Sequence, residues 1–138
     1  MKLQDFDFRI WDEDNEEFYK NPSIFKIKQI KGPHNVVLSS YSDNERINFE
    51  RYDRKFEVEL FTRLYDKNGK KVYENDIVKA KNPFNYLEAK ISIHKEGTFY
   101  LENKSGHYMG SLIYLVEDEG YTIEIIGNIH ENPELLKC

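Results

Sequence analysis

The most informative part of this chain runs Leu64-Tyr65-Asp66-Lys67-Asn68-Gly69-Lys70-Lys71-Val72-Tyr73-Glu74-Asn75-Asp76-Ile77-Val78. Asn68 and Gly69 lie between two strand-like runs, and both residue types tolerate the positive φ that a tight hairpin turn requires. The sequence therefore predicts an antiparallel hairpin that closes at Asn68 and Gly69 and is shaped by Asp66. A second turn is predicted at Asn75 and Asp76, because an Asp side chain can accept backbone N–H groups.

Alternation of apolar and polar residues continues on both sides of this stretch. It predicts strands with one apolar face and one solvated face. In residues 56–60, for example, we expect Val58 to face a core and Glu59 to face water. The runs with this alternation are residues 6–10, 56–60, 87–93 and 121–125.

Turn residues recur about every ten positions after Asp66, a spacing typical of a small barrel or sandwich. Longer strands are expected over residues 86–94 and 108–116. Helical signals are limited to a charged stretch at residues 43–54 and to residues 132–136, where Pro follows a capping Asn. The predicted fold is mainly β, α+β at most, with a short C-terminal helical turn.

Composition agrees with a folded cytoplasmic protein. Of the 138 residues, 39% are apolar and 33% are charged, but 14% are aromatic, and buried rings remove large apolar areas from water. No apolar run approaches the roughly 20 residues of a membrane helix. The acidic N-terminal region lacks the apolar run of a signal peptide. The single cysteine, Cys138, forms no internal disulfide.

Residue patterns of known chemistry are missing from the sequence. The acidic run at residues 12–17 has Glu17 where a calcium loop of the EF-hand type needs glycine. The four histidines do not form an H-E-x-x-H motif. No nucleophile elbow or phosphate-binding glycine motif is present. We therefore expect no catalytic residues, no metal and no cofactor.

A nucleic-acid-binding module is the alternative hypothesis. Residues 63–95 hold eight basic and four acidic side chains, whereas residues 96–138 hold two basic and eight acidic ones. Lysines that alternate with aromatic rings are typical of small barrels that bind single strands. The net charge of −5 argues against this class, and solvated strand faces explain the lysines equally well. The candidate contacts are Lys79, Lys81, Phe84, Tyr86, Lys90 and Lys95.

Three segments of the chain resemble the YopX family, small proteins encoded mainly by phages and prophages of low-GC bacteria. The segments are Phe8-Arg9-Ile10-Trp11-Asp12 with Phe18-Tyr19 after it, residues 64–78, and residues 125–135. Two positions depart from the family pattern, since Arg63 and Asn75 stand where the family usually has glycine. The resemblance implies an SH3-like barrel at residues 63–138 and an oligomerisation part at residues 1–62. It implies no biochemical activity.

Our leading hypothesis is a non-enzymatic phage or prophage accessory protein that acts through protein contacts or homo-oligomerisation. Alternation in the first strand places Arg9 and Trp11 on the face opposite Phe6, Phe8 and Ile10. A two-stranded ribbon is marginal alone. We therefore expect that face to contact another subunit or a partner, or to stay partly open as a binding patch. The expected contacts are Arg9, Trp11, Phe18 and Tyr19.

Overall fold

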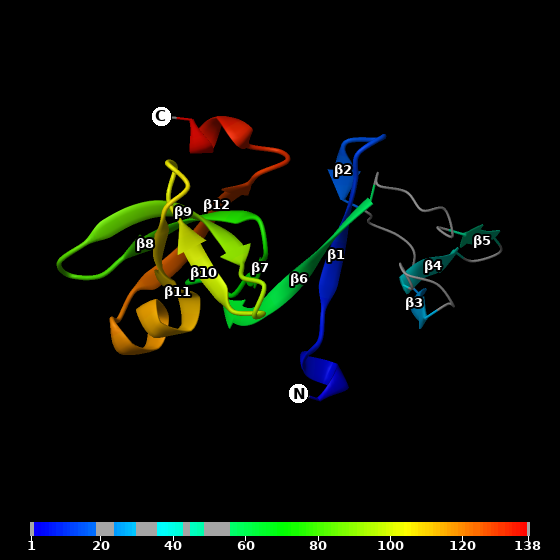
Figure 1. Ribbon diagram of the computed structural model, residues 1–138, viewed down its shortest axis with the longest axis horizontal. Coiled ribbons are helices and arrows are strands. Elements are labelled where there is room, and N and C mark those ends of the chain that lie inside the picture. Colours follow the sequence, from blue (N-terminus) through cyan, green and yellow to red (C-terminus); the bar gives the residue numbers. More distant parts are fainter. Residues whose placement is uncertain (1, 19–23, 30–35, 43–44, 49–55, 138) are drawn as a thin grey trace. The chain divides into compact units, whose positions relative to one another are not determined.

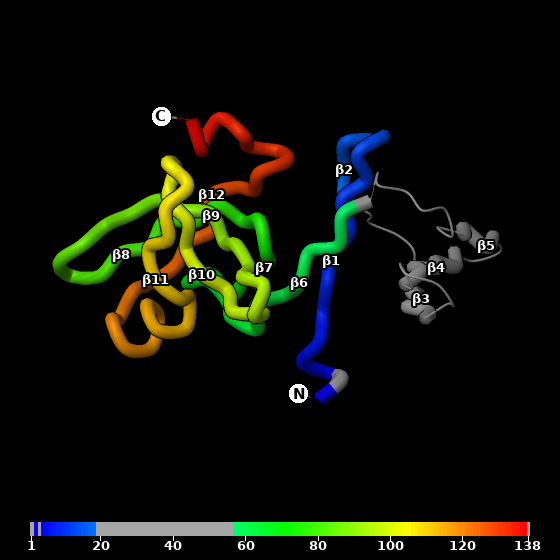
Figure 2. The backbone as a smooth tube through the Cα atoms, viewed as in Figure 1, coloured from blue at the N-terminus to red at the C-terminus, as the bar shows by residue number. Residues whose placement is uncertain are grey.

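The computed structural model describes residues 2–18, 24–29, 36–42, 45–48 and 56–137 (Figure 1). The fold is mainly β, as predicted. The chain divides into two compact units, one of Met1–Arg9 with Glu59–Cys138 and one of Ile10–Val58. The division predicted between residues 62 and 63 falls within strand β6 (Phe56–Tyr65). Figure 2 follows the backbone of both units from end to end.

A curled sheet of five antiparallel strands forms the centre of the first unit. Its strands lie in the order β11-β10-β9-β8-β12, so neighbours in the sheet are mostly neighbours in the sequence. The bounds are β8 Asp76–Lys81, β9 Tyr86–Ile93, β10 Phe99–Glu102, β11 Tyr108–Ser111 and β12 Thr122–Asn128.

The hairpin of β6 and β7 (Lys71–Tyr73) belongs to another sheet and is hydrogen-bonded to the five-stranded one. At the turn of the hairpin, the backbone N–H of Lys67 donates to the carbonyl of Ile123 on β12 at 2.8 Å. On the other side of the hairpin, the N–H of Asn75 donates to the carbonyl of Ile91 at 2.8 Å. These bonds attach the hairpin at both ends, so the sheet becomes a half-barrel.

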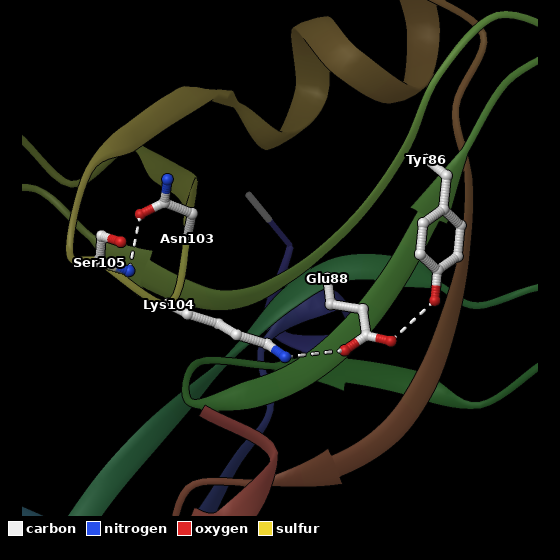
Figure 3. Close-up of a pocket in the computed structure, with 5 residues that line it drawn as sticks. All are labelled: Tyr86, Glu88, Asn103, Lys104 and Ser105. Carbon is white, nitrogen blue, oxygen red and sulfur yellow. Dashed lines mark hydrogen bonds and ion pairs between the residues drawn. The ribbon is translucent and has the colours of Figure 1, made fainter. Parts of the chain in front are cut away.

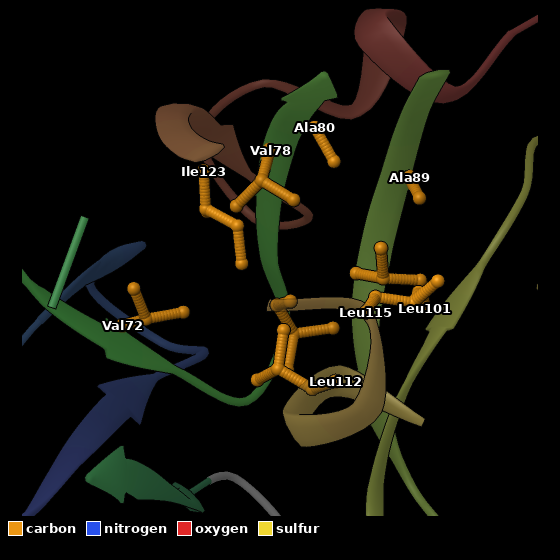
Figure 4. Packing of buried hydrophobic residues seen from close by; sticks show 9 residues of the cluster. Val72, Val78, Ala80, Ala89, Leu101, Leu112, Leu115 and Ile123 are labelled. Carbon is orange, nitrogen blue, oxygen red and sulfur yellow. The ribbon is translucent and has the colours of Figure 1, made fainter. Parts of the chain in front are cut away.

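Apolar side chains from the inner face of the half-barrel and from the helical segment after β11 form the core (Figure 4). The alternation predicted for residues 87–93 is present, because Ala89 and Ile91 are fully buried while Glu88 and Lys90 point to the other face. The core cluster consists of Val72, Val78, Ala80, Ala89, Ile91, Leu101, Leu112, Leu115 and Ile123.

Strand β6 does not follow its predicted alternation. Val58, expected in the core, is 47% exposed, and Glu59, expected in water, is 1% exposed. The burial of this carboxylate is compensated by hydrogen bonds and an ion pair, described below. The period-two prediction is therefore wrong at these two positions.

The strand expected over residues 108–116 is wrong in its second half. Strand β11 ends at Ser111, whose hydroxyl accepts a hydrogen bond from the N–H of Tyr114 at 3.2 Å. A single π-helical turn, η2, follows at Tyr114–Asp118. Leu112 and Leu115 are three residues apart and both buried, so helical spacing carries both side chains into the core.

The described residues form two further sheets, one of which contains the β6–β7 hairpin. One has the order β2-β1-β6-β7 and the other has the order β3-β4-β5. The helical interpretation of residues 43–54 is wrong for Glu45–Asn48, which is strand β5. Outside residues 45–48 that stretch lies outside the described residues. The other bounds are η1 Leu3–Asp5, β1 Phe8–Asp12, β2 Glu17–Phe18, β3 Ile24–Gln29 and β4 Val36–Ser42.

The C-terminal helical turn is present as η3, a 3₁₀ turn at Pro133–Leu136. Pro133 stands at the start of this turn, where its missing N–H is not needed. Among the described residues, no helix has the length and apolar content needed to cross a bilayer.

Candidate functional site

A buried ionic cluster lies on the first unit, between strand β6 and the start of β8. Arg9 Nε donates to Glu59 Oε1 at 2.8 Å, and Arg9 Nη2 lies 2.9 Å from Asp76 Oδ1. The two carboxylate side chains are 1% and 3% exposed. Arg9 also donates to the carbonyl of Glu74 at 3.2 Å. One guanidinium thus joins two buried acids and a backbone carbonyl.

The second oxygen of Glu59 binds two further groups. Asn75 Nδ2 donates to Glu59 Oε2, and His130 Nε2 lies 2.9 Å from the same oxygen. His130 is 71 residues from Glu59 in sequence. The Glu59 carboxylate therefore connects the C-terminal segment to strand β6.

The turn before η3 places His130 on Glu59. Asn128 Oδ1 accepts hydrogen bonds from the backbone N–H groups of His130 and Glu131, at 3.0 and 2.9 Å. Asn132 Oδ1 accepts from the N–H of Asn128 at 3.2 Å. A Cβ at Gly127 would come within 2.5 Å of Asn132 Oδ1, so only glycine fits there. The segment 125–135 that carries the family resemblance is thus a structural turn.

Burial shifts the pKa of two groups in and beside this cluster, Asp76 and Tyr73. It raises the pKa of Asp76 above the ordinary value, although the Arg9 guanidinium and the N–H of Tyr73 act in the opposite direction. Burial also raises the pKa of Tyr73, whose hydroxyl donates to Asp7 at 2.5 Å. Asp7 in turn lies 2.8 Å from Lys71 Nζ. The cluster thereby links β1, β7 and β8 through polar contacts.

The structure places the predicted turn residues in turns. Asp66 Oδ1 accepts from the N–H groups of Asn68 and Lys70, each at 2.9 Å, and Gly69 has φ of +80°. Asn75 has φ of +70°, and Asp76 Oδ2 accepts from the N–H of Tyr73 at 2.8 Å. Asn75 also contacts Glu59, a role that the turn pattern did not indicate.

The predicted partner contacts that the structure describes interact with other residues of the same chain. Arg9 contacts acids of its own chain, and Trp11 is 6% exposed. The Trp11 ring packs edge-on against Phe18, with centroids 4.9 Å apart. The interpretation of Trp11 as an open patch is therefore wrong. A subunit contact at this strand stays a prediction, and Tyr19 lies outside the described residues.

The lysines of the alternative hypothesis alternate with acids. Lys79 stands opposite Glu88 on β9 and Glu124 on β12, and Lys90 Nζ lies 2.9 Å from Glu102 Oε2. The other four candidates are exposed: Lys81, Phe84, Tyr86 and Lys95. The outer face of the sheet therefore brings lysines together with carboxylates and does not form a basic stripe.

A shallow open depression of about 610 Å³ lies on the same outer face (Figure 3). Tyr86 Oη donates to Glu88 Oε1 at 2.7 Å, and Lys104 Nζ lies 3.4 Å from Glu88 Oε2. The hydrogen bond from Tyr86 lowers the pKa of Glu88. The lining groups, which also include Asn103 and Ser105, thus form contacts with one another.

Sequence reasoning missed Glu59 and His130 as members of the cluster. Alternation indicated a solvated Glu59, and no local motif indicated a partner 71 residues away. The sequence held only two weak signals for these residues. Glu59 is an acidic residue within an apolar strand pattern, and His130 lies inside the segment 125–135.

Fold and cluster together define a small, mainly β protein in which buried polar residues hold segments of its own chain together. The model of the YopX protein family matches residues 7–137, and the chain belongs to the YopX family. The predicted family is confirmed. None of the curated proteins matches this chain.

Two solved structures resemble the chain over nearly its full length. Protein yopX from Bacillus subtilis has 20% sequence identity and a TM-score of 0.64, with 94% of this chain and 97% of that chain covered. Protein EF1440 from Enterococcus faecalis has 25% identity and a TM-score of 0.55, with 94% and 96% covered. These structures support the fold.

Proposed function

We propose that this chain is a non-enzymatic accessory protein of phage or prophage origin that acts in the cytoplasm. It works through protein–protein contacts, including contacts between copies of itself. Family membership supports the origin, through the resemblance of residues 7–137.

Exposed aromatic rings are the observation that carries this proposal. Tyrosine and phenylalanine are enriched in protein interfaces, because a ring offers a large contact area at little cost in side-chain entropy. In the described part of the chain, five rings are about half exposed or more. They are Tyr65 (59%), Phe84 (89%), Tyr86 (57%), Tyr108 (57%) and Tyr114 (48%).

The buried polar cluster supports a non-enzymatic role. General acid–base chemistry needs a side chain within reach of a substrate proton. Glu59 and Asp76 are buried, and each accepts hydrogen bonds from groups of its own chain. His130 directs Nε2 to Glu59. These contacts favour a structural role for the acids and the histidine.

The concentration dependence of thermal unfolding tests contacts between copies. Association makes the melting temperature rise with protein concentration. We expect that rise in the natural chain, a smaller rise in Tyr65→Ala, which removes an exposed ring, and its loss in Trp11→Ala, which disturbs strand β1. Trp11 is buried, so the variant melts lower at every concentration; the slope against concentration is the informative quantity. A Trp11→Ala protein with native mass would refute the role of strand β1.

A further inference from the structure

Phe84 stands at the tip of the β8–β9 hairpin and is 89% exposed. The backbone of the tip is hydrogen-bonded within the turn, since Asn82 Oδ1 accepts from the N–H groups of Phe84 and Asn85 at 2.9 and 2.7 Å. The N–H of Asn82 donates to the carbonyl of Asn85 at 3.0 Å, and Pro83 has a fixed φ. The backbone that carries this exposed phenylalanine is thus ordered by its own turn.

The hairpin tip is attached to the end of η2. Asn82 Nδ2 donates to the carbonyl of Glu119 at 3.1 Å, and Tyr114 Oη donates to Glu119 Oε1 at 2.6 Å. Figure 1 shows the tip and the helical turn at the same end of the five-stranded sheet. Phe84 and the half-exposed Tyr114 therefore belong to one surface, which we call the hairpin end.

The hairpin end is acidic. Glu117, Asp118 and Glu119 are exposed, and Lys81 is the exposed cation at the end of β8. Three negative charges and one positive charge give a local charge of −2 beside two exposed rings. This charge repels nucleic-acid phosphates, anionic lipid and the same face of a second copy.

We propose that the hairpin end, formed by Phe84, Tyr114, Glu117, Asp118 and Glu119, docks a segment of another protein that is both apolar and basic. Phe84 is the anchor, because it is a large exposed apolar side chain on a backbone that the turn already orders, so little backbone entropy is lost on binding. The carboxylates select lysine or arginine beside the partner's apolar residues. The inference rests on the proposed function, since it names the partner chemistry of one protein-contact surface.

Amide chemical shifts of the ¹⁵N-labelled full chain test this inference with a defined probe. The probe is an amphipathic 14-residue peptide of leucine and lysine, and the matched peptide replaces lysine by glutamate. We expect shift changes confined to residues 82–86 and 113–120 with the lysine peptide and none with the glutamate peptide. Phe84→Ala should weaken binding about tenfold or more, as expected for an anchor residue.

Two further variants make the test specific. Tyr108→Ala removes an exposed ring away from the hairpin tip and should leave binding unchanged. The double variant Glu117→Lys and Asp118→Lys should reverse the preference, so that the glutamate peptide binds. Both altered acids are exposed, and Phe84 touches water over most of its surface, so these proteins should melt near the natural temperature.

The inference is overturned if the lysine peptide shifts residues elsewhere, or if Phe84→Ala and the charge reversal leave its affinity unchanged. A chain that self-associates but ignores the peptide refutes the hairpin end and leaves the proposed contacts between copies intact. A monomer that binds the peptide through residues 82–86 refutes those contacts and supports the hairpin end.

Discussion

Two residues other than glycine have a left-handed backbone conformation at positions where the family pattern has glycine. Arg63 has φ of +71° and Asn75 has φ of +70°. A residue with a Cβ is disfavoured in this region, and Asn is the better tolerated of the two. The Arg63 side chain is 55% exposed and lies 3.5 Å from Asp5, whereas Asn75 binds the buried Glu59. The two departures from glycine therefore have different consequences.

Restoring glycine at position 63 should stabilise the chain relative to alanine there. Arg63→Ala keeps the Cβ and the strained φ, and Arg63→Gly removes both. We expect the glycine variant to be more stable than the alanine variant by about 1 kcal/mol, the cost of a left-handed residue that carries a Cβ. Both variants lose the exposed contact with Asp5 equally. Urea unfolding followed by circular dichroism measures the difference, and equal midpoints would contradict the assignment of strain.

Restoring glycine at position 75 should instead lower the stability of the chain. Glycine suits the backbone of this turn, but Asn75→Gly removes the amide that donates to the buried Glu59. Loss of a hydrogen bond to a buried carboxylate costs about 1–3 kcal/mol. We expect a destabilisation of that size in the same urea experiment. A variant as stable as the natural chain would show that the Asn75–Glu59 bond contributes nothing.

Asp66 shows how one side chain can join three elements. Its first oxygen closes the β6–β7 turn, and its second accepts from the N–H of Ile125 on β12 at 3.2 Å. Burial opposes ionisation, but the backbone N–H groups of Lys70, Ile125 and Asn68 outweigh it and lower the pKa of Asp66. The carboxylate thus stabilises the closure of the half-barrel while it is ionised.

Asp66→Asn should therefore lower stability in a pH-dependent manner. A carboxylate whose pKa is depressed by folding contributes stability above its unfolded pKa of about 4, and this is lost as the pH falls through the folded value. We expect a loss of about 1–3 kcal/mol at neutral pH that shrinks below about pH 4. The control Asp118→Asn changes an exposed acid of the same type. A stability difference that is constant from pH 7 to the acid limit would contradict the role of the ionised Asp66.

Local sequence signals predicted elements well where the pattern fits only one kind of backbone structure. Asn68 and Gly69 predicted the hairpin, and the alternation at residues 87–93 predicted β9. The π-helical turn was missed because apolar residues at 108–116 also fit a strand, and the close approach of Leu115 to Gly110 is a tertiary contact that the sequence pattern does not show. Glu59 was missed because its partners lie far away in the sequence. Local pattern cannot show which distant group meets a buried charge.

Charge pairing on the outer face of the five-stranded sheet argues against a nucleic-acid surface there. In the folded sheet Lys79 stands opposite Glu88 and Glu124, and Lys90 pairs with Glu102. Counterion release, which drives nonspecific binding to nucleic acid, needs a concentrated positive surface. The outer face of the five-stranded sheet instead presents alternating charges.

We therefore expect no change in fluorescence anisotropy of single-stranded or duplex DNA probes with high-micromolar protein at low salt. The triple variant Lys79→Glu, Lys81→Glu and Lys90→Glu should behave in the same way. Binding that weakens with salt and disappears in the triple variant would support the nucleic-acid-binding hypothesis and contradict the charge argument.

Sedimentation velocity of the full chain at several concentrations measures its mass in solution, and so tests contacts between copies most directly. We predict a species whose mass is a multiple of the 16.5 kDa chain and whose population grows with concentration. Association must bury a surface that one chain leaves exposed, and the exposed rings supply such surface. A single species of one chain mass at every concentration would contradict the account.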